Sequence, residues 1–295
     1  MKILFIGVFD TENKSTNNSQ AKAFEILGHK VLRYNYREKA QYIGNEFRDT
    51  DIIQLCRAYK PDLTLFSKCN GVNIRVFEEC KKVSTTCLWF MDPLVTYDNA
   101  EIKEKTKEAS FVCCSVQNVT EYASQFNSQS FCVFEGFDSF IEKPQKQVAQ
   151  ITDVSFIGSL HTDRAEKLKL IETKIQLINN AYGLQHRIAV SQSKINLNFC
   201  TTDGASDRIF KVMGAKGFLL TDDWTGRDTM FKDGEDLVIY KSYKDLDTKI
   251  KYYLEHPEER DKIRANGYKT VQKYNRIEWS KRILESFTQH QENQQ

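Results

Sequence analysis

The hydrophobic pattern along the chain predicts two successive runs of alternating strands and helices. In the first half, short unbroken apolar runs alternate with segments whose apolar residues recur at helical spacing. Unbroken apolar runs of this length are typical of parallel strands that are covered on both faces. The pattern predicts strands at residues 2–8, 29–34, 63–67, 85–90, 111–115 and 129–134, and helices at 19–27, 49–59, 73–82 and 118–126. Right-handed crossovers should join these strands into one sheet.

The second half continues the alternation with a separate set of elements. It predicts strands at 153–157, 194–199 and 218–221, and helices at 165–180, 187–192 and about 277–287. On the helix at 165–180, four residues share one apolar face: Leu168, Ile171, Ile175 and Ile178. We therefore expect a second α/β domain with its own parallel sheet.

A composition change separates the two halves. Pro144 is followed by the polar run 145–150, which is typical of a linker between domains. This indicates a first domain at residues 1–145 and a second at 146–275. The helix and tail at 276–295 follow the second domain.

Composition and charge narrow the class of protein. A length of 295 residues suits two domains, and an apolar share of 40% is enough to build their cores. The net charge of +2, with basic residues spread among acidic ones, makes a nucleic-acid partner unlikely without excluding a local basic cleft. No apolar run approaches the roughly 20 residues of a membrane span. Eight cysteines without Cys-x-x-Cys spacing fit buried thiols in a reducing compartment, so we expect a cytoplasmic protein.

The segment 203–222 carries the clearest candidate chemistry. It reads as a polar loop, a helix that opens near Ser206, a glycine turn and a buried strand. A helix N-terminus attracts phosphate, Ser206 or Asp207 can cap it, and Arg208 in its first turn can bind a phosphate or ribose oxygen. Gly217 would let the chain leave the helix in a left-handed conformation. An ordinary helix–turn–strand connection would fit the same residues.

A second candidate turn lies at residues 158–167. Gly158 and Ser159 follow a strand, and a glycine there lets the backbone approach a ligand closely. Arg164 and Lys167 lie near the start of the helix that follows. An ordinary strand-to-helix connection would also explain this pattern.

Two further residues are candidates for catalysis. Asp92 ends the strand at 85–90, and open α/β sheets place their ligand contacts at such strand ends. The same residue could instead cap the turn before Pro93. His161 lies in the loop after Gly158, where a solvated loop histidine is the alternative.

Several phrases occur in a fixed order along the second half. They are Ser-Lys-Ile-x-Leu-Asn at 193–198, Arg-x-Phe at 208–210, Leu-Leu-Thr at 219–221 and His-Pro-Glu-Glu-Arg at 256–260. This order resembles the GT-B glycosyltransferases, most closely the CgeB-like (spore-maturation-protein-like) branch of the group 1 glycosyl transferases. The resemblance implies an α/β GT-B fold, in which two Rossmann-like domains have parallel sheets facing a central cleft. The first domain would then lie on the acceptor side, and the second would bind the nucleotide sugar. The helix and tail at 276–295 would cross back onto the first domain, as the last helices of GT-B enzymes do.

The resemblance also implies an activity and a set of site residues. The chain would transfer a sugar from a nucleotide-diphosphate sugar to a glycan, a protein, a small molecule or a modified nucleic-acid base. It would need no cofactor and no metal, and retention of configuration is favoured. The candidate donor-binding residues are Gly158, Ser159, Arg164, Lys167, Ser206, Asp207, Arg208, Lys211 and Asp222. The candidate catalytic residues are Arg208 for the diphosphate, and Asp92 or His161, with Asp10 as a further candidate base.

One position departs from the resembled pattern. The CgeB-like branch has Arg-x-Phe-Glu where this chain has Lys211 in the fourth place. In related enzymes the glutamate accepts hydrogen bonds from the ribose, and a lysine cannot accept any. Either Lys211 contacts phosphate, or Asp207 or Asp222 binds the ribose, or nucleotide binding is weak or lost. The lysine also favours an alternative function, a non-catalytic nucleotide-sugar binding module of the same fold. An unrelated α/β enzyme such as an epimerase would fit the strands but not the ordered motifs.

Overall fold

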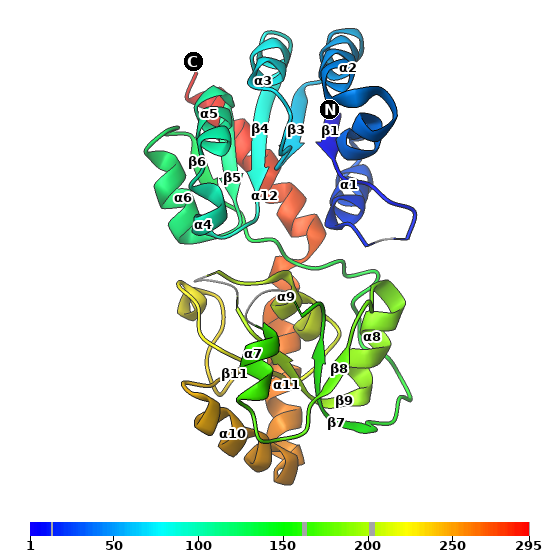
Figure 1. Cartoon of the computed structure of the whole chain (residues 1–295), viewed down its shortest axis with the longest axis vertical. Coiled ribbons are helices and arrows are strands. Elements are labelled where there is room, and N and C mark those ends of the chain that lie inside the picture. Colours follow the sequence, from blue (N-terminus) through cyan, green and yellow to red (C-terminus); the bar gives the residue numbers. More distant parts are fainter. Residues whose placement is uncertain (13, 161–163, 201–203, 295) are drawn as a thin grey trace. The chain divides into compact units, whose positions relative to one another are not determined.

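The computed structural model describes residues 1–12, 14–160, 164–200 and 204–294 (Figure 1). The chain forms two compact units, Met1–Glu135 with Arg276–Gln295, and Gly136–Asn275. The first unit ends at Glu135, ahead of the boundary that the polar run after Pro144 indicates. The reason is that the segment before Pro144 packs on the second unit, where Glu142 lies 3.1 Å from Nδ1 of His186 and both side chains are buried.

The first unit contains a parallel sheet with the strand order β2-β1-β3-β4-β5-β6. Its strands are β1 (Lys2–Gly7), β2 (Lys30–Asn35), β3 (Leu63–Ser67), β4 (Thr85–Phe90), β5 (Phe111–Cys114) and β6 (Ser130–Cys132). Its helices are α1 (Thr16–Ile26), α2 (Tyr36–Tyr59), α3 (Ile74–Lys81), α4 (Leu94–Tyr97), α5 (Ala100–Glu108), α6 (Gln117–Ser124) and α12 (Arg276–Glu292).

Helices cover both faces of this sheet, as the unbroken apolar strands predict (Figure 1). Leu4 and Ile6 of β1 face a core shared with α2, α3, α5 and α6, whereas Ile3 and Phe5 face a core shared with α1 and α12. On the second face, Trp279 of α12 packs edge-on against Trp89, with ring centroids 5.2 Å apart. The last helix therefore belongs to the first unit, although it follows the second unit in the sequence.

The second unit contains a parallel sheet with the strand order β11-β10-β9-β7-β8. Its strands are β7 (Thr152–Ile157), β8 (Gln176–Ile178), β9 (Ser193–Asn198), β10 (Leu219–Thr221) and β11 (Val238–Ile239). Its helices are α7 (Arg164–Lys169), α8 (Gly183–Gln192), α9 (Asp207–Gly214), α10 (Tyr243–Glu255) and α11 (Pro257–Val271). Two short 3₁₀ turns, Arg227–Thr229 and Gln272–Tyr274, complete it.

The single helix predicted for residues 165–180 is wrong. Helix α7 ends at Lys169, and the chain then forms the edge strand β8, in which Gln176 pairs with Ser155 of β7. The carboxylate of Asp247 accepts hydrogen bonds from the backbone N–H groups of Glu172 and Thr173, each 3.0 Å long. These bonds give the two amides a partner outside a helix, so the apolar spacing that suggested one continuous helix is coincidental.

Two other local predictions need correction. The left-handed residue after α9 is Lys216, with φ of 61°, and not Gly217. Gly217 is instead required by packing, because a Cβ there would lie 2.5 Å from Cγ1 of Val190. Helix α2 starts at Tyr36, well before the predicted residue 49, and it is interrupted at Gly44, whose φ of 79° is left-handed. In the described ranges, no helix is both long and apolar enough to span a bilayer.

Candidate functional site

The predicted site residues of the second unit gather at one edge of its sheet. In the order β10-β9-β7, three neighbouring parallel strands end at Thr221, Asn198 and Ile157. The residues that follow these strands therefore meet at the carboxyl edge, where open α/β sheets bind ligands.

Arg208 of α9 packs against the turn that follows β7. Its Nε donates a hydrogen bond to the carbonyl of Ile157, 2.7 Å away, and its guanidinium lies 4.7 Å from the ring centroid of Phe156. Gly158 has φ of +145°, and a Cβ there would lie 3.1 Å from Cζ of Arg208 and nearer still to Nη2. A glycine at 158 is thus required twice, by its backbone conformation and by the close approach of the arginine.

Asn198 connects the end of β9 to both sides of this edge. Its buried amide oxygen accepts hydrogen bonds from Nη1 of Arg208 and from the hydroxyl of Ser206, both at 2.9 Å. Its amide nitrogen donates to the hydroxyl of Thr221, also at 2.9 Å. Asn198 therefore fixes the position of Arg208 relative to the end of β10, and it was not among the predicted site residues.

The charge of Arg208 is only partly compensated. Burial, and to a smaller extent the nearby positive charge of Arg164, lowers the pKa of its guanidinium to about 10, against smaller opposite effects of Asp207 and Cys200. The hydrogen bonds of the guanidinium go to the neutral oxygens of Ile157 and Asn198. A desolvated cation with neutral partners is stabilised by an incoming anion, which makes this edge a candidate anion site.

The first turn of α9 is arranged differently from the prediction. Ser206 is the N-cap residue, but its hydroxyl donates to Asn198 and makes no cap hydrogen bond with the helix. Lys211 pairs with Asp207 one turn earlier, with Nζ and Oδ2 2.5 Å apart. Lys211 is thus held along α9 by a carboxylate.

Asp222 follows β10 and borders a cavity of about 720 Å³. Burial raises the pKa of its carboxyl, although its hydrogen bonds with Cys200 and Thr221 and the charge of Lys167 act in the opposite direction. Its Oδ1 accepts a hydrogen bond of 2.6 Å from the backbone N–H of Cys200. The other residues that line the cavity are Asp223, Arg227, Asp233, Ile239, Tyr240, Lys241, Ser242 and Tyr243.

Helix α7, which follows β7 along the chain, brings further basic groups to this region. Nη1 of Arg164 donates to the carbonyl of Ser159 at 3.2 Å, which folds the arginine back over the turn after Gly158. Lys167 lies close enough to Asp222 for its charge to act on that carboxyl. The predicted catalytic residue His161 lies outside the described residues.

Two candidate bases of the first unit both have partners. Asp92 follows β4, and its Oδ1 lies 2.5 Å from Nζ of Lys68, which follows β3. The carboxylate of Asp10 accepts hydrogen bonds from the backbone N–H groups of Glu12, Lys14 and Ser15. Asp10 therefore shapes the loop after β1, and Asp92 forms an ion pair.

Sequence reasoning missed Asn198, Lys68 and Cys200. The rule that selected Asp92, a polar residue at the end of a parallel strand, would also have selected Asn198 and Lys68. Cys200 takes part through its backbone N–H, which no side-chain pattern reveals. Among the described residues, no group of three or more His, Cys, Asp and Glu is placed to hold a metal ion.

Comparisons with known proteins agree on one fold. The structure of Anabaena HepE in complex with UDP-glucose superposes with a TM-score of 0.70 at 10% identity, covering 98% of this chain and 100% of that one. Sucrose-phosphate synthase from Thermosynechococcus elongatus gives 0.72 at 10% identity, covering 98% of both chains. A glycosyltransferase from Rickettsia africae gives 0.68 at 13% identity, covering 99% of both. No curated protein sequence matches the chain significantly.

At these identities the likeness shows the fold, two Rossmann-like units of the GT-B glycosyltransferase type. The family itself is shown by sequence. The model of the family described as "Glycosyl transferase-like" matches residues 138–285, which span half of the chain and include Gly158, Arg208 and Asp222. The chain therefore belongs to the glycosyl transferase-like family and is a glycosyltransferase of GT-B fold.

Proposed function

We propose that this enzyme transfers a sugar from a nucleoside diphosphate sugar and binds the diphosphate on Arg208. The observation that carries the proposal is the desolvated guanidinium of Arg208, held by two neutral oxygens at the carboxyl edge of the sheet. A diphosphate supplies the negative charge that this position lacks. HepE, which shares the fold, has been crystallised with UDP-glucose and with UDP.

The chemistry requires stabilisation of a leaving diphosphate. An acceptor hydroxyl oxygen forms a bond to the anomeric carbon, while the bond from that carbon to the diphosphate oxygen breaks. The electron pair of the broken bond stays on the diphosphate, which also receives the proton of the acceptor. Positive groups at the site of developing charge are the largest expected contribution. Arg208 would supply it, supported by Arg164 and Lys167 of the neighbouring helix.

The ribose would bind on Asp222 and not on Lys211. Lys211 is paired with Asp207 and offers no acceptor atom. Asp222 borders the 720 Å³ cavity, and its carboxylate oxygens can accept hydrogen bonds from ribose hydroxyls. Gly158 and Ser159 would give the donor a close approach to the backbone at the end of β7.

Three finer points extend the proposal. We propose transfer without an essential metal, because Arg208, Arg164 and Lys167 provide the positive charge. Retention is favoured by the partners of Asp10 and Asp92, which engage both described candidate bases, while His161 stays a candidate catalytic residue. The ordered motifs from Ser193 to Arg260 support placement in the CgeB-like branch.

Nucleoside diphosphate release from a panel of UDP, GDP and TDP sugars tests the proposal. We expect release from one donor, and thermal stabilisation by the same compound. The variant Arg208→Ala should lose both, whereas the control Arg264→Ala, on α11, should keep both, because Arg264 pairs with Asp261 of its own helix and is not part of the proposed site. Binding without release, across glycan, protein and small-molecule acceptors, would instead favour a non-catalytic nucleotide-sugar binding module.

A further inference from the structure

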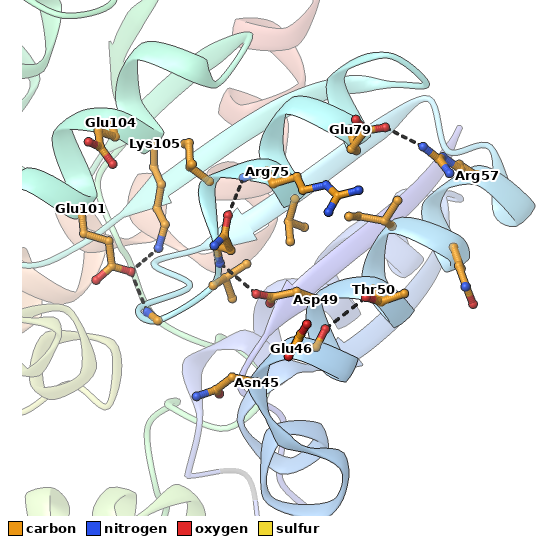
Figure 2. A pocket seen from close by; sticks show the side chains of 17 residues that line it. Asn45, Glu46, Asp49, Thr50, Arg57, Arg75, Glu79, Glu101, Glu104 and Lys105 are labelled. Carbon is orange, nitrogen blue, oxygen red and sulfur yellow. Dashed lines mark hydrogen bonds and ion pairs between the residues drawn. The ribbon is translucent and has the colours of Figure 1, made fainter.

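A second cavity lies in the first unit and is unrelated to the carboxyl edge of the second sheet. It is a groove of about 770 Å³ between α2, α3 and α5 (Figure 2). Helix α2 contributes Asn45, Glu46 and Asp49, and α5 contributes Glu101 and Glu104. Twelve of its 17 lining residues are polar or charged, so the groove is suited to a ligand rich in hydrogen-bonding groups.

Buried Arg48 fixes one wall of the groove. Its side chain is 2% exposed and donates hydrogen bonds to the carbonyl of Gly71 at 2.6 Å and to the side-chain oxygen of Asn45 at 2.9 Å. It also pairs with Asp49, whose second oxygen accepts the backbone N–H of Asn73 at 3.2 Å. Arg48 thus attaches α2, just after its interruption, to the turn before α3.

Buried Lys105 fixes the opposite wall in the same way. Its side chain is 1% exposed, donates to the carbonyl of Cys69 at 2.7 Å, and pairs with Glu101. The same carboxylate oxygen of Glu101 accepts the backbone N–H of Gly71 at 2.6 Å (Figure 2). Both walls are therefore held by buried cations, and the carboxylates of Asp49 and Glu101 have fixed positions before any ligand arrives.

Three charged side chains of the groove are left for a ligand. Glu46, Arg75 and Glu104 are exposed and form no side-chain hydrogen bond or ion pair within the described part of the chain. The remaining charges are paired, as in Arg57 with Glu79 at 2.5 Å. The groove thus offers a ligand both acceptors and a donor, and its lining carries five carboxylates and three basic side chains.

The charge of the groove selects among ligand classes. A nucleic acid would meet five carboxylates against three basic side chains, so its phosphates would be repelled. An apolar peptide anchor needs an open apolar pocket, but Val72 and Val76, which line the groove, are already buried in the core. A neutral polyhydroxyl ligand can use both the donors and the acceptors.

Two exposed aromatic residues lie close in sequence to residues that line the groove. Phe47 directly follows Glu46, and Tyr42 lies three residues before Asn45, on the other side of Gly44; the two residues are 72% and 77% exposed. An exposed aromatic ring offers a ligand a large and rigid contact area. A pyranose presents C–H groups on its face and hydroxyls on its edge. A flat aromatic ring can pack against the face, while neighbouring hydrogen-bonding groups bind the hydroxyls.

We propose that the groove between α2 and α3 binds an oligosaccharide, and that the acceptor of the transferred sugar is a glycan. Arg75, Glu46 and Glu104 bind its hydroxyls, and Tyr42 and Phe47 pack against its rings. The acceptor role rests on the proposed function, whereas binding of the glycan does not.

An array of defined oligosaccharides, probed with the full chain and followed by calorimetric titration of the strongest binder, tests the groove. The variants Phe47→Ser and Arg75→Ser should each weaken the titrated affinity at least tenfold. Phe140→Ser and Arg282→Ser are matched controls, because both remove an exposed side chain of the same type outside the groove, and they should leave the affinity unchanged.

Parallel titration with UDP, GDP and TDP separates the two proposals. If the chain binds a nucleotide but no glycan of the array, the proposed oligosaccharide site is contradicted, whereas the proposed donor site still stands. Glycan binding that Phe47→Ser and Arg75→Ser do not weaken also overturns it, as does selective binding to a peptide array. Glycan binding without nucleotide binding supports the groove and contradicts the donor site.

Discussion

The guanidinium of Arg208 occupies the space that a side chain at Gly158 would fill. A Cβ at residue 158 would lie 3.1 Å from Cζ of Arg208, and φ at this position is +145°. The arginine in α9 and the glycine after β7 therefore depend on each other. This pair is the structural basis for the proposed diphosphate site.

The variant Gly158→Ala tests this dependence. The added Cβ strains the backbone and displaces the guanidinium, so we expect the free energy of unfolding to fall by about 1–3 kcal/mol. Nucleotide affinity should fall as well, because Arg208 loses its position. Chemical denaturation and calorimetry measure the two effects. An alanine at 158 that changes neither would show that the approach of Arg208 is not required.

A substitution at Asn198 tests whether the positive charge of Arg208 is used in binding, because aspartate has nearly the same shape as asparagine. In Asn198→Asp the carboxylate keeps the acceptor for Arg208 and Ser206, but it pairs with the guanidinium and compensates its charge. We expect a folded protein whose nucleotide affinity is at least tenfold weaker. A titration in which Asn198→Asp binds nucleotide as tightly as the parent chain would argue that the charge of Arg208 is not used.

The raised pKa of Asp222 predicts a pH-dependent cost in stability. Because burial raises the pKa in the folded state, the folded chain binds this proton more tightly than the unfolded chain, whose carboxyl has a pKa of about 3.9. Stability from this group is therefore greatest below that value and is lost as the pH rises through the raised pKa. Asp222→Asn, which keeps an acceptor for the Cys200 N–H, should raise the melting temperature at pH 7.

The higher melting temperature expected for Asp222→Asn should disappear at acidic pH. At pH 3 the carboxyl of Asp222 is protonated and neutral, as the amide is, so the difference in melting temperature should shrink. The substitution should also weaken nucleotide binding if the ribose binds here. A melting temperature that falls at pH 7 in Asp222→Asn would indicate that the ionised carboxylate is stabilised by its neighbours.

Trp279 tests the attachment of the last helix. It is 1% exposed and packs against Trp89 and Phe24 of the first unit, with centroids 5.2 and 5.5 Å apart. Trp279→Ala should destabilise the first unit by about 3–5 kcal/mol, because it leaves a large cavity. Hydrogen exchange should show the loss in β1, β3 and β4. If Trp279→Ala lowers the protection from hydrogen exchange only within Gly136–Asn275, the assignment of α12 to the first unit is contradicted.

The sequence predicts those helices and strands whose buried residues follow a regular pattern along the chain. Strands β3 and β4 have the predicted bounds, because they are unbroken apolar runs covered on both faces. Residues 36–47 of α2 are mostly exposed, so they carry no apolar stripe, and the helix was predicted to begin only at residue 49. The edge strand β8 was missed because the segment before it is held by Asp247, far along the chain, through the amides of Glu172 and Thr173.

The site was predictable only in part, for the same reason. Gly158 and Arg208 were identified separately from local turns, but their mutual packing depends on β7 and α9 lying side by side. Asn198 was missed because its role lies in contacts with residues of other elements. The groove of the first unit combines three helices that no single motif connects.

Calorimetric titration of UDP, GDP and TDP, each beside its parent nucleoside, tests the central claim most directly. The account predicts that one diphosphate binds far more tightly than its nucleoside. It also predicts that Arg208→Ala, checked for folding by circular dichroism, reduces the ratio of diphosphate affinity to nucleoside affinity at least tenfold. The control Arg264→Ala should leave this ratio unchanged. Equal affinity for diphosphate and nucleoside, or an undiminished difference in folded Arg208→Ala, would contradict a diphosphate site on Arg208.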